Sequence, residues 1–168
     1  MTKEFESMAR LIAERSDRAF VFENIALGSG KPGGERADFI VLHPSGLYLL
    51  LTQEWNGIVS GNEAAEHWVI RTADGTVAYM DDPAGKCRRQ AELLSKKCKG
   101  ISNYLKMVIV HGNESHIAEM NTWEDLQVLS LAEFLEQVSV WDELPVTVPG
   151  PARDSLKKQL TMLQIFSK

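Results

Sequence analysis

The chain has 168 residues, of which 44% are hydrophobic and 24% are charged, so its length and composition are those of an ordinary globular domain. No apolar run approaches the roughly 20 residues that span a bilayer, and the first residues lack the apolar stretch of a secretory signal, which excludes a membrane protein and predicts a cytoplasmic one. The net charge of −5 argues against a protein that binds nucleic acid constitutively through a strongly basic surface.

The first half of the chain predicts one helix followed by a run of strands. Apolar residues recur at helical spacing in the first segment, and the later segments are apolar runs bounded by Gly, Pro and Asn. The glycine-rich segment 28–34 lacks the Ser or Thr that follows the lysine of a phosphate-binding loop, so we expect a hairpin loop there. The expected elements are a helix over residues 3–15 and strands over residues 19–27, 37–43, 46–53, 58–60, 67–72 and 76–80.

The second half predicts helices alternating with two further strands. Pro83 suits the first turn of a helix, and Gly100 suits the position just after its end. The order of elements predicts the α/β (α+β) class, with one mixed sheet, helices packed against it and a single domain over residues 1–168. The expected elements are helices over residues 83–99 and 131–138, a last helix with Leu156, Leu160 and Leu163 on one face, and strands over residues 105–111 and 126–129.

The two cysteines lie on one predicted helix, eleven residues apart. Cys87 and Cys98 share its apolar face but are too distant to form a disulfide, so we expect buried thiols. The four histidines are scattered and have no zinc-binding spacing, so we expect no zinc site.

The charges are unevenly distributed along the chain. Residues 84–108 carry seven basic residues against the single acidic Glu92, a net charge of +6 that leaves −11 elsewhere, and residues 107–152 contain neither Lys nor Arg. This pattern fits either a contact with a polyanion or two surface patches that face each other across the fold. The candidate nucleic-acid contacts are Lys86, Arg88, Arg89 and Lys96, which as a widely spread band equally suit a solvated surface.

One segment, residues 38–60, goes beyond a generic fold. Asp38 is followed by a Pro44-Ser45-Gly46 turn, a hydrophobic strand that reaches Gln53, and then Trp55-Asn56-Gly57. This arrangement resembles the nuclease-related domain (NERD) family, a branch of the PD-(D/E)xK endonuclease-like superfamily. The likeness extends weakly to roughly residues 5–98, and it implies a restriction-endonuclease-like mixed sheet flanked by helices and a metal-dependent nuclease.

The sequence departs from the family at the two positions that carry the chemistry. Leu51 stands where the resemblance implies a Glu, and Gln53 stands where it implies a Lys. Cleavage of a phosphodiester needs Mg²⁺ or Mn²⁺ held by carboxylates, together with a donor near the phosphate. Gln53 can still donate a hydrogen bond, but Leu51 cannot hold a metal ion.

Another acidic residue could replace the missing carboxylate. Because side chains alternate along a strand, Glu54 points away from the face of Leu51, and Glu35 fails by the same rule relative to Asp38. Glu6 is the best remaining candidate, since the resemblance places an acidic residue of the first helix near the site.

Asp38 and Trp55 each have a structural alternative. Asp38 either remains a metal ligand or only stabilises the start of its strand and pairs with Arg36. Trp55 suits a wedge that packs over the end of the sheet better than a platform for stacking bases.

Three functions follow from these observations. The first is a degenerate nuclease-related domain that has lost efficient hydrolysis, needs no cofactor, and serves as a binding or regulatory module for DNA or RNA. The second is an active Mg²⁺- or Mn²⁺-dependent nuclease in which Asp38 and Glu6 hold the metal and Gln53 orients water. The third is a protein-interaction domain, in which the acidic segment 112–145 meets a basic partner or the basic helix of another copy of the chain.

Overall fold

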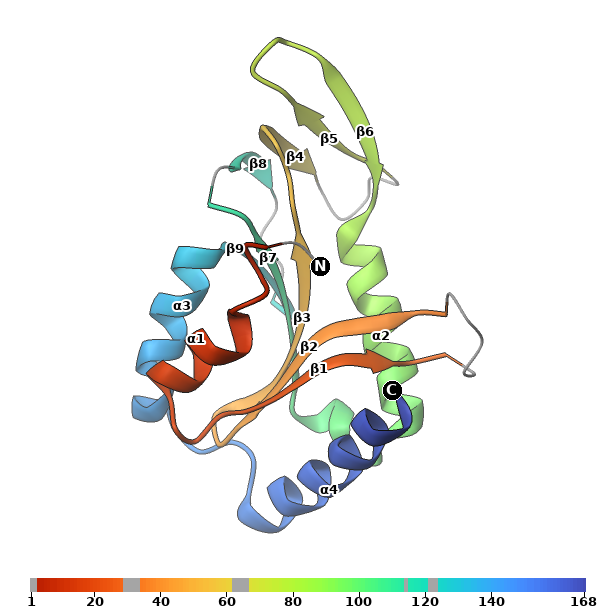
Figure 1. Ribbon diagram of the computed structural model, residues 1–168, viewed down its shortest axis with the longest axis vertical. Helices are drawn as coiled ribbons and strands as arrows, with labels where there is room; N and C mark the ends of the chain where they lie inside the picture. Colours follow the sequence, from red (N-terminus) through yellow and green to blue (C-terminus); the bar gives the residue numbers. More distant parts are fainter. Residues whose placement is uncertain (1–2, 29–33, 62–66, 114, 121–123) are drawn as a thin grey trace.

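The computed structural model describes residues 3–28, 34–61, 67–113, 115–120 and 124–168 (Figure 1). Its helices are α1 (Met8–Arg15), α2 (Pro83–Lys97), α3 (Leu131–Val140) and α4 (Gly150–Phe166), with a 3₁₀ turn at Trp141–Glu143. Its strands are β1 (Phe20–Ala26), β2 (Arg36–His43), β3 (Gly46–Gln53), β4 (Ile58–Gly61), β5 (His67–Arg71), β6 (Val77–Asp81), β7 (Leu105–His111), β8 (His116–Met120) and β9 (Leu126–Ser130).

The larger sheet has the order β1-β2-β3-β7-β9. The strands β1, β2 and β3 pair antiparallel, whereas β7 joins β3 in parallel from Leu47 beside Leu105 to Gln53 beside His111, and β9 joins β7 in parallel. Residues 46–51 of β3 are all buried, because helices cover both faces of this central strand. The α/β class with a mixed sheet between helices is therefore confirmed.

A second, smaller sheet corrects the prediction of a single mixed sheet. Its order is β6-β5-β4-β8, with β4 following β3 and β8 following β7 along the chain, so the parallel pair continues beyond the larger sheet (Figure 1). The break falls at Gly57, whose φ of 145° is open to glycine but not to a strand residue. The strand β8 was not predicted, because its His and Glu residues interrupt the apolar alternation of a strand.

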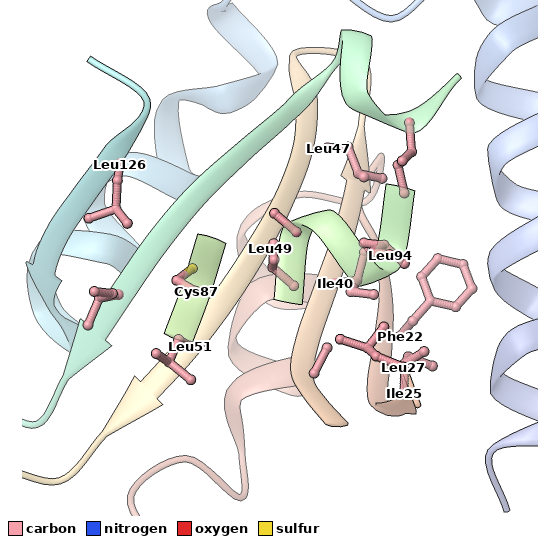
Figure 2. Packing of buried hydrophobic residues seen from close by; sticks show 14 of the residues in the cluster. Phe22, Ile25, Leu27, Ile40, Leu47, Leu49, Leu51, Cys87, Leu94 and Leu126 are labelled. Atoms are coloured by element: carbon pink, nitrogen blue, oxygen red, sulfur yellow. The ribbon is translucent and has the colours of Figure 1, made fainter. Parts of the chain in front are cut away.

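Two apolar clusters lie on opposite faces of the larger sheet. The helices α2 and α4 contribute Leu94 and Leu160 to one cluster, which also contains Leu49 of β3 (Figure 2). The helices α1 and α3 contribute Ile12 and Phe134 to the other. Strand side chains alternate between the clusters, as the period of two requires.

The predicted helix and strand positions are largely confirmed, apart from their ends. The first helix begins at Met8 rather than at residue 3, because residues 3–7 form a turn, and α3 continues two residues beyond its predicted end. Most of the predicted hairpin loop 28–34 lies outside the described residues. None of the described helices is both long and apolar enough to span a bilayer.

The expectation of buried, unbonded thiols is also confirmed. Cys87 and Cys98 are free and buried. Burial raises the pKa of Cys87 to about 12 and that of Cys98 to about 11, so both thiols stay protonated and unreactive at neutral pH.

Gly57 supports a prediction about stability. A Cβ at this position would lie 2.3 Å from the carbonyl oxygen of Arg71, so Gly57→Ala adds a backbone clash to the strain of a positive φ. We expect a loss of roughly 2 kcal/mol in the free energy of unfolding, measured by urea denaturation. Gly75→Ala is the matched control, because Gly75 also has a positive φ but a Cβ there meets no atom within 4 Å. Equal losses in the two variants would contradict the close approach of β4 to β5.

A partly buried hydrogen-bond network joins the β2–β3 turn to the 3₁₀ turn after α3. The backbone N–H of Ser45 donates to Nδ1 of His43 (3.0 Å), so Nε2 carries the ring proton and donates to Oδ1 of Asp142 (2.7 Å). The Ser16 hydroxyl donates to the same Asp142 oxygen (2.8 Å). The turn, the end of α1 and the chain after α3 are therefore tied through one carboxylate.

The network predicts that acid destabilises the fold. Burial lowers the pKa of His43 below 6.5, although the hydrogen bond to Asp142 opposes this shift. As the pH falls below 6.5, His43 becomes protonated in the unfolded chain while it stays neutral in the folded chain. The free energy of unfolding therefore decreases until the pH has passed the lower pKa of His43 in the folded chain. Urea midpoints measured between neutral pH and pH 5 should fall, and His43→Gln should flatten this dependence. An unchanged slope in His43→Gln would assign the effect to other groups.

Candidate functional site

A cleft of about 670 Å³ opens where β3 ends and α2 begins. The cleft places Gln53 of β3 opposite the first turns of α2, which follow directly from β6. The hollow therefore lies at the end of the strand that carries the motif residues. It is lined by Glu35, Gln53, Met80, Asp81, Asp82, Pro83, Gly85, Lys86 and Arg89.

Asp38 is held by the neighbouring strand. The backbone N–H and the hydroxyl of Thr52 both donate to Oδ2 of Asp38, each at 2.9 Å. The register of β2 with β3 runs from His43 to Phe39, so this carboxylate joins the strands beyond the last paired residue. Arg36 instead donates to Asn24 and to the carbonyl oxygen of Ser167. Of the two structural roles considered for Asp38, support of its strand is found and pairing with Arg36 is not.

Leu51 belongs to the apolar core. It is 1% exposed, and Figure 2 shows it near Cys87 of α2, in the same buried cluster. Asp38 lies two residues before Ile40, which belongs to the same cluster, so the alternation of β2 places this carboxylate on the α2 side of the sheet. The position beside Asp38 is thus filled by packed hydrocarbon.

Gln53 lies on the same side of β3 as Leu51, as the alternation of the strand predicts, and its half-buried side chain lines the cleft. Across the cleft, Oε1 of Glu35 accepts a hydrogen bond from Nε2 of Gln90 (3.1 Å) and lies 3.6 Å from Nη2 of Arg89. Glu35 is therefore engaged with α2 and is not directed at Asp38.

The beginning of α2 adds charged groups to the cleft. The Asp82 carboxylate caps the helix by accepting from the N–H of Ala84 (2.9 Å), and Asp81 lies 3.7 Å from Nδ1 of His67. Lys86 has no ion-pair partner among the described residues. No side-chain hydrogen bond within the described residues engages Lys86 or Gln53, so both remain available to a ligand.

The four basic residues predicted to contact nucleic acid do not share one surface. Lys86 and Arg89 line the cleft. Arg88 turns toward β9, where its Nη2 lies 3.3 Å from Oδ1 of Asp125, and Lys96 lies 3.7 Å from Glu92 in the second half of α2.

Glu6 is exposed and precedes α1, next to Phe5, which packs in the cluster beneath α1 and α3. No hydrogen bond or ion pair within the described parts of the chain joins Glu6 to Asp38. The nearby Glu4 instead accepts from the backbone N–H of Asn113 (3.0 Å), just after β7.

Trp55 packs as a wedge over the end of the sheet, as the structural role considered in the sequence predicted. Its side chain is 6% exposed, and its ring centroid lies 5.9 Å from that of Trp68 and 5.5 Å from that of His111. A ring buried in this way is not available to stack on a base.

The residues around Asp38 do not fit a divalent metal ion. A magnesium site needs several oxygen ligands in octahedral geometry, whereas Leu51 supplies hydrocarbon and Thr52 occupies one oxygen of Asp38. Within the described residues, no group of three or more His, Cys, Asp or Glu side chains is arranged to hold a metal.

Sequence reasoning missed Gln90, which is 1% exposed and fixes one wall of the cleft by donating to Glu35 and to the carbonyl oxygen of Arg36. The signal was present, because a polar side chain three residues after Cys87 falls on the buried face of α2.

Comparison with known proteins identifies a family for most of the chain. The family model of the nuclease-related domain matches residues 2–118, which include the cleft, Asp38 and α2. No curated protein and no solved structure matches the chain.

Proposed function

The chain belongs to the nuclease-related domain family, and we propose that it is a degenerate member that binds DNA or RNA as a binding or regulatory module and hydrolyses it weakly or not at all. It requires no metal cofactor in this role. The family relationship supports a nuclease-related function, and the residues of the site support the narrower proposal.

The observation that carries the proposal is the environment of Leu51. This side chain is 1% exposed and lies in an apolar cluster, on the same face of the sheet as Asp38. A metal there would have one carboxylate, already engaged with Thr52, and would lose its water shell against hydrocarbon. Hydrolysis that depends on such a metal is therefore strongly impaired.

Binding does not need the metal. Lys86 and Arg89 lie on the first two turns of α2, where the helix dipole also favours an anion. Gln53 adds an amide donor from the opposite wall. A phosphate of a nucleic-acid backbone is the anion that this cleft suits, because such contacts position a strand without reading its sequence.

The test is a binding titration in EDTA with labelled single- and double-stranded oligonucleotides, followed by fluorescence anisotropy at several salt concentrations. We expect affinity to fall steeply with salt, and Lys86→Ala with Arg89→Ala to weaken it by about tenfold. The matched control is Lys96→Ala with Lys97→Ala, which removes the same charge from the far end of α2. Equal weakening by both double variants would contradict binding in the cleft.

Absence of binding at low salt would overturn the nucleic-acid role and favour the protein-interaction alternative, whose partner is a basic protein or a second copy of the chain. Cleavage that depends on Glu6 would favour the active nuclease with a relocated carboxylate.

We propose the cytoplasm as the location, since two buried free thiols suit a reducing compartment. That residues 1–168 form a single domain stays a prediction.

A further inference from the structure

A second hollow, separate from the cleft, lies where β7 and β9 end and α3 begins. Its volume is about 470 Å³. The walls come from three places: the end of β7 with the turn that follows it, the start of β8, and the first turn of α3. It is lined by His111, Asn113, Ser115, His116, Ile117, Ser130, Ala132 and Glu133.

His111 presents an unused hydrogen-bond acceptor. The side chain is 3% exposed, and Nδ1 lies 2.9 Å from the carbonyl oxygen of Gly112 and 2.7 Å from the hydroxyl of Ser115. A carbonyl oxygen only accepts, so Nδ1 carries the proton and Nε2 carries a lone pair. Nε2 has no hydrogen-bond partner within the described residues, and the ring to which it belongs lines the hollow.

The start of α3 does not favour an anion, because two amides of its first turn are already used and Glu133 adds a negative charge. The N–H of Ala132 donates to Oδ1 of Asn113 (2.9 Å), and that of Glu133 donates to the hydroxyl of Ser130 (3.1 Å). Glu133 uses only Oε1, which accepts from the N–H of Ser130 (2.9 Å). These hydrogen bonds lower the pKa of Glu133, so its carboxylate is ionised at neutral pH.

The hollow therefore combines an imidazole lone pair with a negative carboxylate, and the chain supplies no cation nearby in sequence, since residues 107–152 contain neither Lys nor Arg. A planar guanidinium offers five donors to two such acceptors, which a neutral or anionic group cannot match. We propose that this hollow binds the guanidinium of an arginine side chain presented by a partner protein, between Nε2 of His111 and the carboxylate of Glu133. This site does not depend on the proposed nucleic-acid role.

The test uses N-acetyl-arginine amide as the probe and N-acetyl-citrulline amide, its uncharged analogue, as the chemical control. Binding to the full chain is followed by the backbone amide NMR shifts of Ser115, Ala132 and Glu133. We expect saturable shifts with the arginine probe and none with the citrulline probe. Glu133→Gln, which retains the capping interaction with Ser130, should weaken binding by at least about tenfold.

Glu136→Gln is the matched control variant. Glu136 is exposed one turn later on α3, so this substitution removes the same charge outside the hollow. Its affinity for the arginine probe should stay within about twofold of the unaltered protein. Equal weakening by both variants would reduce the effect to general electrostatic attraction and overturn the site. Equal shifts with citrulline, or no saturable shift, would overturn it as well.

Discussion

Leu51→Glu is expected to lower the free energy of unfolding by about 3–5 kcal/mol in EDTA, and Mn²⁺ is expected to restore part of this loss. The reason is that the new carboxylate lies in the apolar cluster beside Asp38, where neither group gains a counter-charge. A metal ion bound by both would supply that charge. At a free Mn²⁺ concentration of 100 times its Kd, binding adds about 2.7 kcal/mol.

Leu51→Gln is the control for this measurement, because it places a side chain of the same size and polarity in the cluster without the charge. It should be destabilised in urea titrations and should not respond to Mn²⁺. The unaltered protein should not respond either. Stabilisation of the unaltered protein by Mn²⁺ would show an intact metal site, and a Leu51→Glu variant that ignores Mn²⁺ would show that position 51 is not a ligand position.

Asp38→Ala is expected to destabilise the protein by about 3–4 kcal/mol, the second large effect. The substitution removes the acceptor for two hydrogen bonds from Thr52, and a carboxylate accepts such bonds more strongly than a neutral group. It leaves the N–H and the hydroxyl of Thr52 half-buried without a partner, at the point where β2 and β3 part. Urea denaturation measures the loss.

Asp38→Asn separates the structural role from a metal-binding role. The amide oxygen of Asn still accepts from Thr52, so stability should fall by only about 1 kcal/mol, whereas metal binding by a carboxylate would be lost. Thr52→Val removes the hydroxyl donor. Its loss in the free energy of unfolding should therefore be closer to that of Asp38→Ala than the loss in Asp38→Asn is. If Asp38→Ala cost no more than Asp38→Asn, the contact with Thr52 would contribute little to the fold.

Most of the fold followed from local signals in the sequence. Pro83 and the apolar stripe through Cys87 and Leu94 placed α2, and the unbroken apolar run of β3 indicated a central strand covered on both faces. These signals are reliable because burial imposes a period on the side chains regardless of tertiary detail. The family resemblance, drawn from Asp38, Pro44, Gly46, Trp55 and Gly57, is confirmed by the match over residues 2–118.

The remaining features depend on contacts between distant segments. The strand β8 forms by pairing with β4, and the first paired residues, Ile58 and His116, are 58 residues apart in the sequence. The residue pattern of β8 alone does not indicate a strand. The bond from Gln90 to Glu35 joins residues 55 apart, and the Asp38–Thr52 contact needs the register of two strands. Pairing of this kind is set by the whole fold, so charge and spacing along the chain could not predict it.

The most direct test of whether Leu51 abolishes metal-dependent hydrolysis is a cleavage assay with single- and double-stranded DNA and RNA in the presence of Mg²⁺ or Mn²⁺. We expect the nucleic acid to stay intact on incubation with the purified protein, because Leu51 leaves the ion without its second carboxylate. Cutting by the unaltered protein that disappears in Asp38→Asn, a variant expected to remain folded, would contradict it.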